Sequence, residues 1–243
     1  MPGTLQLDPD EIVRTINALS RRIDERFPDS GLGRLCSRLL DVGGHARERA
    51  AWIARPLPAL RIGTGVLVVL IVAGLVTTVA QIQMPQGGFD LGEFIQVLEA
   101  GINDVVLIGV AVFFLITLET RIKRRRALDA LHDLRVIAHI IDMHQLTKDP
   151  ERILGQGADT ESSPRRAMTP PELGRYLDYC SEMLSLAGKI AALYVQRFPD
   201  DVALGAVNEI EDLTTGLSRK IWQKLMILYS LGERSARRVE SEG

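Results

Sequence analysis

Three histidines and two aspartates lie close together in one stretch of the sequence, HDLRVIAHIIDMH at residues 132–144. Two metal ligands on one face of a helix need a spacing of three or four residues, which His139 and Asp142 have. His144 lies about 140° from His139 around a helix, so a second helix would have to complete a metal or proton-handling site. We favour the alternative, a polar helix edge that holds hydrogen bonds inside a bundle. The sequence therefore predicts no bound metal and no other cofactor.

A second set of polar residues brackets an apolar run, Val105–Leu118. Asn103 and Asp104 precede this run, and Glu119 follows it. Ionisable groups near the core of a membrane often serve the passage of ions or protons, so these residues are candidates for a pore. The run is short for a helix that spans a bilayer, which favours the alternative that all three side chains lie at the lipid headgroups.

Motifs of the common enzyme classes are absent from the sequence. There is no Walker loop, no dinucleotide-binding glycine motif after a strand, no nucleophile elbow and no HExxH pair. Cys36 and Cys180 lack the spacing of a zinc site or a disulfide framework. A net charge of −2 with 25% charged residues is not typical of a nucleic-acid-binding protein. We predict that the chain is not an enzyme and binds no nucleic acid.

Two apolar segments position these polar residues. Ile62–Ile82 contains no charged residue and has about the 20 residues that an α-helix needs to cross a bilayer. A core helix of a soluble protein would show a polar face, and Val66–Val76 shows none. We predict transmembrane helices at 60–83 and 102–120, joined by an external connector at 84–101 with an amphipathic helix. That helix either lies on the outer leaflet or runs straight into the second span.

Basic residues flank both predicted spans. The first is preceded by Arg47, Arg49, Arg55 and Arg61, and the second is followed by Arg121, Lys123, Arg124, Arg125 and Arg126. The connector contains no Lys or Arg. Because basic flanks remain on the cytoplasmic side, we predict a bacterial-type inner membrane with both termini in the cytoplasm. The cluster after the second span is either a determinant of this topology, which we favour, or a site for anionic lipid headgroups.

Small residues gather on the first span. Ala73 and Thr77 are four residues apart, as are Gly74 and Thr78. Pairs with this spacing share a helix face and allow a second helix to approach closely. The pattern predicts helix packing, either within the hairpin of spans or between subunits.

The other segments are predicted to be helical and cytoplasmic, apart from a linker and a tail. They comprise amphipathic helices in 1–59, an extension of the second span in 121–153, a flexible linker in 154–168, a helical hairpin in 169–231 and a charged tail in 232–243. Apolar residues recur at steps of four and three in both terminal regions, which is typical of helices that pack along a seam.

Capping residues mark two helix starts. Asp8 is expected to cap the first helix, with Pro9 as its first residue and Glu11 completing a capping box. Thr169 and Glu172 form a second capping box. The tetrapeptide RFPD occurs at 26–29 and again at 197–200, each time between two predicted helices. We interpret this repeat as the reuse of one turn rather than as a duplication.

The sequence predicts an all-α membrane protein, a two-span transmembrane hairpin with a cytoplasmic bundle built from both terminal regions. The expected partners are the lipid bilayer, further copies of the chain and other membrane proteins. We expect a non-enzymatic scaffold or assembly protein that self-associates through its transmembrane and heptad-like helices. The alternative is an oligomeric ion channel or channel subunit whose second span lines the pore.

Overall fold

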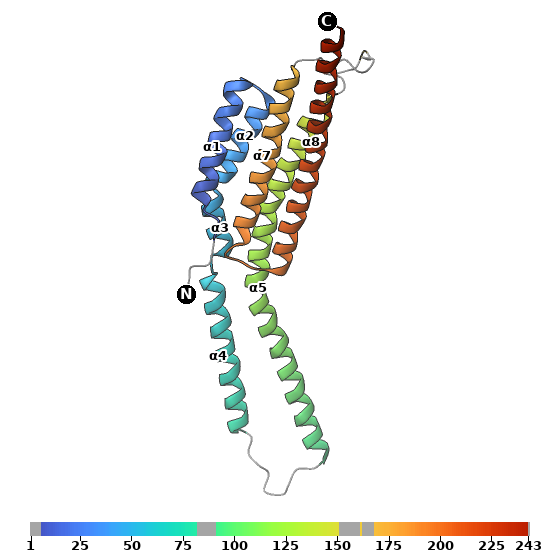
Figure 1. Cartoon of the computed structure of the whole chain (residues 1–243). Coiled ribbons are helices and arrows are strands. Elements are labelled where there is room, and N and C mark those ends of the chain that lie inside the picture. The colour runs from blue at the N-terminus through green and yellow to red at the C-terminus, as the bar shows by residue number, and fades with distance from the viewer. Residues whose placement is uncertain (1–5, 82–90, 151–160, 162–167, 243) are drawn as a thin grey trace. The chain divides into compact units, whose positions relative to one another are not determined.

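The computed structural model describes residues 6–81, 91–150, 161 and 168–242, although not every side chain within them. Every regular element in these ranges is an α-helix (Figure 1), which confirms the all-α class. The chain divides into two compact units. We call the unit made of Met1–Ala54 and Arg126–Gly243 the bundle, and the unit Arg55–Arg125 the hairpin.

The bundle begins with α1 (Pro9–Arg26), whose start is the predicted one. The carboxylate of Asp8 accepts a hydrogen bond from the backbone N–H of Asp10 at 2.9 Å, which satisfies a donor that the first turn leaves free. Glu11 does not complete a capping box but pairs with Arg14, one turn along the helix. The predicted apolar stripe is buried and consists of Ile12, Ile16, Leu19 and Ile23.

The two RFPD segments form different turns. The first leads from α1 into α2 (Gly31–Gly44), with Asp29 in the left-handed region at φ 55° and Ser30 as the cap. In the second, Asp200 is itself the cap, because its carboxylate accepts from the N–H of Ala203 at 3.1 Å. This cap begins α8 (Asp201–Glu242). The interpretation of the repeat as the reuse of one turn is therefore wrong, because the cap is Ser30, after the tetrapeptide, in one copy and Asp200, within it, in the other.

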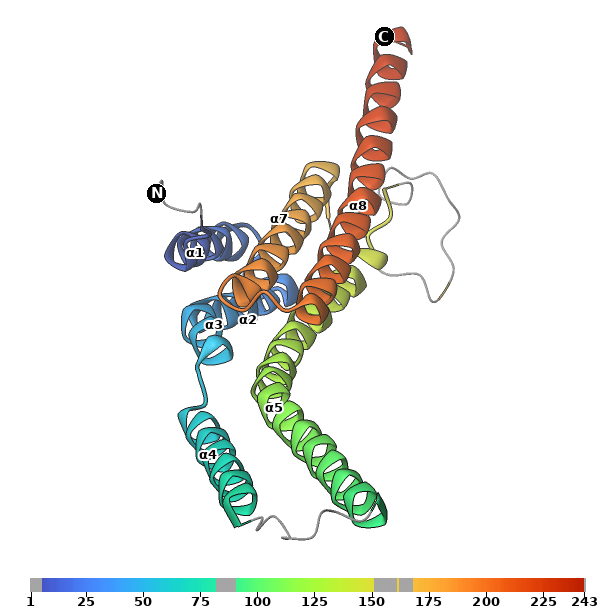
Figure 2. The same ribbon diagram turned by 90° about the horizontal axis from the view of Figure 1, so that it is seen from below.

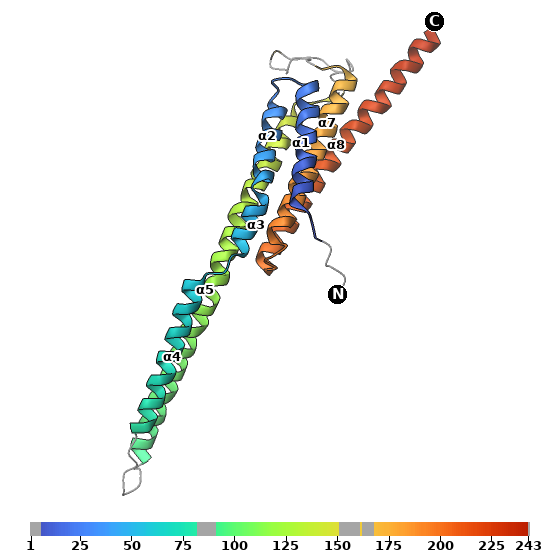
Figure 3. The same ribbon diagram turned by 90° about the vertical axis from the view of Figure 1, so that its left-hand side faces the viewer.

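The centre of the bundle is α7 (Pro170–Val195), which contacts α1, α2, α8 and the short helix α3 (Ala46–Ala54). It lies between α1 and α8 in all three views (Figures 1, 2 and 3). The N–H of Thr169 donates to the Glu172 carboxylate at 2.7 Å, as the capping box predicts. The seam predicted within α7 is buried throughout and comprises Leu173, Leu177, Cys180, Leu184, Ala187, Ala191 and Tyr194.

The long helix α5 (Leu91–Leu146) contributes to both units. Its C-terminal part supplies a row of core residues to the bundle: Ala127, Ala130, Leu131, Leu134, Ala138 and Ile141. The helix has no break near residue 102, where the sequence places the end of the connector and the start of the second span. Of the two arrangements left open by the sequence, α5 adopts the one in which the connector helix runs straight into the span.

The hairpin consists of α4 (Pro58–Gln81) and the first part of α5, and the segment 82–90 lies outside the described residues. The chain has two helices long and apolar enough to cross a membrane. Large apolar side chains face outward on both: Val69 is 66% exposed and Phe113 is 67% exposed. A helix that is apolar all round needs a protein core or lipid around it, and no described side chain of the hairpin is buried in a protein core. It supports the prediction of a membrane protein.

Candidate functional site

The polar end of the hairpin is a compact charged cluster that we call the Glu119 clamp. It joins α4 to α5 through Glu119, which accepts from Arg61 Nε at 2.7 Å and from Arg61 Nη2 at 2.9 Å. Lys123, one turn further along α5, places its Nζ 2.7 Å from the same carboxylate. Glu119 and Lys123 are each only 13% exposed, whereas the Arg61 side chain is largely exposed. The clamp thus fixes two helices at one polar point.

The clamp changes the interpretation of Glu119 as a pore residue. Both of its carboxylate oxygens are engaged by cations, and the two-point contact with Arg61 is the strongest geometry for such a pair. A carboxylate held in this way is suited to tying helices together. Of the other two pore candidates, Asn103 is exposed on α5, and the side chain of Asp104 lies outside the described residues.

The basic cluster after the second span is divided among several tasks. Lys123 belongs to the clamp, and the guanidinium of Arg121 stacks over the ring of Phe114 at 5.5 Å. Arg125 is exposed, and Arg124 is half-buried. Arg121 and Arg125 are therefore the members of the cluster whose charge is best placed to meet an anionic headgroup.

Arg126, the first residue of the bundle after the span, binds an aromatic residue. Its guanidinium lies 4.4 Å from the centroid of the Trp52 ring, within the range of a cation–π interaction. Its Nη1 also donates to the Trp52 carbonyl oxygen at 3.2 Å. The pair links α3 to α5. No spacing pattern in the sequence predicts this pair or the Arg61–Glu119 pair, because each joins segments that are far apart in the chain.

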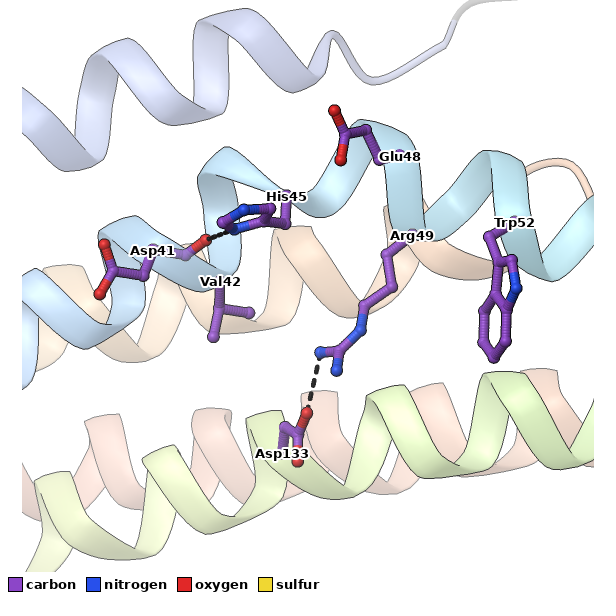
Figure 4. Close-up of a pocket in the computed structure, with 7 residues that line it drawn as sticks. All are labelled: Asp41, Val42, His45, Glu48, Arg49, Trp52 and Asp133. Carbon is purple, nitrogen blue, oxygen red and sulfur yellow. Dashed lines mark hydrogen bonds and ion pairs between the residues drawn. The ribbon is translucent and has the colours of Figure 1, made fainter.

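A groove of about 710 Å³ in the bundle is lined by residues of α2 and α3, among them Trp52, and by Asp133 of α5 (Figure 4). Arg49 reaches across it from α3, and its Nη1 donates to the Asp133 carboxylate at 2.8 Å. His45 Nδ1 is 2.8 Å from the carbonyl oxygen of Asp41. The side chains of Val42 and Trp52 form the apolar part of the groove wall. The groove is shallow, and the polar groups that cross it are paired with one another.

The histidine-rich stretch of α5 does not form one site. His144 is half-buried, and its Nδ1 is 3.2 Å from the hydroxyl of Tyr176. Burial, together with the cations Lys148 and Arg34, lowers the pKa of His144 below its ordinary value.

The other two metal candidates lie apart from His144. His139 is exposed, and the Asp142 carboxylate accepts from Gln145 Nε2 at 2.6 Å. Within the described ranges, no three His, Cys, Asp or Glu side chains come close enough together to hold a metal ion. Metal binding at His139, Asp142 and His144 would therefore need groups from outside these ranges.

The small residues of the first span are open to a neighbour. Ala73, Gly74 and Thr77 are exposed on α4, and Thr77 Oγ1 donates to the Gly74 carbonyl at 2.8 Å. The side chain of Thr78 lies outside the described residues. A Cβ added at Gly74 would meet no atom within 4 Å, so its role in helix packing stays a prediction.

Comparison of the chain with protein-family models, with curated proteins and with solved structures found no match.

Proposed function

We propose that the chain is a non-enzymatic scaffold or assembly protein of a bacterial-type inner membrane. In this proposal the hairpin anchors the protein in the lipid bilayer, both termini are cytoplasmic, and the bundle and hairpin provide surfaces for further copies of the chain or for other membrane proteins. No nucleic acid, metal or other cofactor takes part.

One observation carries the proposal: two carboxylates near the candidate sites are engaged in ion pairs, while large apolar side chains are uncovered. Glu119 and Asp133 are held in ion pairs. On the bundle, whose core is otherwise well buried, Met143 is 67% exposed and Trp222 is 62% exposed. Exposed apolar surface of this kind is typical of contacts with proteins or lipid rather than of a catalytic centre.

The second candidate is an oligomeric ion channel or channel subunit, with α5 lining a pore. It is favoured by the presence of Asn103 and Asp104 at one end of the apolar run. It is disfavoured by the Glu119 clamp, because a carboxylate that already binds two cations in the protein is poorly suited to passing ions. We therefore rank it below the scaffold.

Mass and flux measurements separate the two functions. The protein is purified in a mild detergent, its mass is measured by light scattering, and it is then placed in liposomes for K⁺ and H⁺ flux assays. We expect a complex of more than one chain and the flux of protein-free liposomes. A monomer at every concentration overturns self-association. A flux that Asp104→Asn reduces overturns the scaffold in favour of the channel.

Topology is tested with introduced cysteines. A cysteine at Gly88 in the connector should react with an impermeant maleimide in intact cells, because the connector is predicted to be external. A matched cysteine at Asp212, exposed on α8, should react only after permeabilisation. The opposite pattern would reverse the proposed orientation.

A further inference from the structure

A regular stripe of side chains on α5 is uncovered in the bundle. It consists of Val136, His139, Met143 and Leu146, spaced by three, four and three residues. Val136 is 40% exposed, Leu146 is 63% exposed, and His139 and Met143 are also exposed. We call these four residues the α5 stripe.

The opposite face of α5 packs into the core of its own bundle. Leu134, Ala138 and Ile141 are fully buried in the bundle core. Each flank is also tied down: Asp133 pairs with Arg49 of α3, and the Gln145 carbonyl accepts from Lys224 Nζ of α8 at 2.6 Å. The helix cannot turn to bury the stripe inside its own chain. None of the bundle residues that the structure describes covers the stripe, which leaves it open to a partner from outside.

The stripe has the register of a coiled-coil seam. If Val136 and Met143 occupy positions a of a heptad, His139 and Leu146 occupy positions d. The residues that α5 buries in its own bundle then fall at b, c and f, including Ile137, Ala138 and Ile141. One helix therefore carries two faces, an inner one that is packed and an outer one with four consecutive seam positions free of fixed charge.

We propose that a second copy of the chain covers the α5 stripe, so that two α5 helices pack in parallel about a two-fold axis. The inference rests on the proposed self-association and names its interface. The parallel direction follows from the shared membrane, because copies inserted with one topology run their α5 helices in the same sense. A two-fold contact places each stripe residue opposite its own counterpart, as in parallel dimeric coiled coils.

The charges beside the stripe are compatible with this pairing. In a parallel pair, each g position faces the following e position of the other helix. Arg135 would then face Ile140, and Asp142 would face Thr147, so like charges do not meet at these positions. Arg135 is in addition neutralised by Glu209 of its own chain.

The seam is short, and the membrane compensates for its length. Four positions bury little area, so we expect modest affinity in dilute solution. Confinement of both copies to one bilayer raises their effective concentration, as a tether does, so a short seam suffices there. His139 supplies a polar layer of the kind that fixes register in coiled coils, at some expense of stability.

A competing surface exists on α8, where Trp222, Met226 and Tyr229 are exposed at steps of four and three. The preceding position of that stripe is Arg219, so a two-fold contact would place two arginines in opposition. The α8 stripe therefore has fewer uncharged seam positions than the α5 stripe. It provides a matched control of similar exposure and composition.

Cysteine cross-linking in native membranes tests the interface directly. Val136→Cys and Met143→Cys should each form a disulfide-linked dimer on mild oxidation, because a and d residues meet their own counterparts at a parallel two-fold seam. Trp222→Cys and Asp212→Cys should give at least about tenfold less dimer. Cys36 and Cys180 are buried and do not interfere.

Glutamate substitutions in the α5 stripe test the same interface independently of the cross-links. Met143→Glu with Leu146→Glu should weaken the dimer by about 100-fold, seen as a monomer by light scattering in detergent. Trp222→Glu with Met226→Glu should keep the wild-type mass. All of these side chains are exposed, so both variants should retain the wild-type circular dichroism and unfolding temperature.

The outcomes separate this inference from the proposed function. If the α8 variant disperses the complex and the α5 variant does not, the α5 interface is overturned while self-association stands. If none of the four cysteine variants cross-links and the wild-type chain does not exceed the mass of a monomer, both proposals fall.

Discussion

The bundle and the hairpin use the same apolar residues with opposite exposure. In the bundle, Ile16, Leu134 and Leu177 are completely buried by neighbouring helices. In the hairpin, residues such as Val69, Leu70 and Phe113 face outward. Burying a large aliphatic side chain contributes about 1.5–3 kcal/mol in water, so the hairpin forgoes this gain unless its surroundings are apolar. This difference is the one expected if water surrounds the bundle and lipid surrounds the hairpin.

Their polar residues follow the same division. The bundle places ion pairs along its rim, as between Arg22 and Glu182. Among the described residues of the hairpin, the ion pairs gather at one end, in the Glu119 clamp. A polar contact in the middle of the apolar run would cost several kcal/mol in hydrocarbon. At its end, the same contact can meet headgroups and water.

The largest effect is expected from a charged substitution in the bundle core. Leu177→Asp places a carboxylate among fully buried side chains and should cost about 4 kcal/mol or more, enough to abolish cooperative unfolding. Circular dichroism during heating measures it. Val202→Asp, at an exposed position of α8, is the control and should leave the transition in place.

Two leucine-to-alanine substitutions compare a buried site of the bundle with an exposed site of the hairpin. Leu134→Ala should lower the free energy of unfolding of the bundle by about 3 kcal/mol, because it leaves a cavity. Leu70→Ala removes the same atoms from an exposed site of the hairpin and should change that free energy by less than about 0.5 kcal/mol. Denaturant unfolding of the two variants in the same detergent measures both changes in free energy. Equal effects would contradict the division into two solvents.

Substitutions at the polar end of the hairpin should change the binding of anionic lipid by a smaller amount, in opposite directions for basic and acidic residues. Arg121→Gln with Arg125→Gln should weaken binding of phosphatidylglycerol by about 2 kcal/mol, at about 1 kcal/mol for each cation near an anionic surface.

Glu119→Gln should strengthen the binding of phosphatidylglycerol, because Arg61 and Lys123 lose their carboxylate partner. Lipid titration of delipidated protein measures both, with phosphatidylcholine as control. A weaker binding in Glu119→Gln would instead show that the clamp builds the surface.

The smallest effect concerns pH. Since the pKa of His144 is lowered in the folded bundle, the folded state binds fewer protons than the unfolded chain there. The stabilising contribution of neutral His144 is therefore fully present above the ordinary histidine pKa of about 6.5 and declines as the pH falls below it. Unfolding temperatures across this range should show the decline, and His144→Gln should flatten it. A stability that rises on acidification in the wild type alone would contradict the assignment.

Local patterns in the sequence were sufficient for much of the fold. The cap at Asp8, the Thr169–Glu172 box and the seam from Leu173 to Tyr194 depend on residues a few positions apart, so spacing alone predicts them. The continuity of α5 was left open, because Gly101 neither compels a bend nor forbids one.

The candidate site was less predictable for a physical reason. Arg61 with Glu119, and Trp52 with Arg126, are brought together only by folding, and no periodicity records such pairs. The two RFPD turns show the converse limit, since identical residues fold differently when Ser30 follows one copy and Asp201 the other.

The two thiols of the chain have a consequence for its cell biology. Burial raises the pKa of Cys36 to about 11 and that of Cys180 to about 12, so both remain protonated and shielded at neutral pH. Neither thiol is poised to be oxidised in the folded bundle. A failure of these thiols to react in intact cells would reflect their packing on either side of the bilayer. In the proposed topology, the arginines and lysines that flank the two apolar helices set the orientation, and sulfur chemistry neither enforces nor reports it.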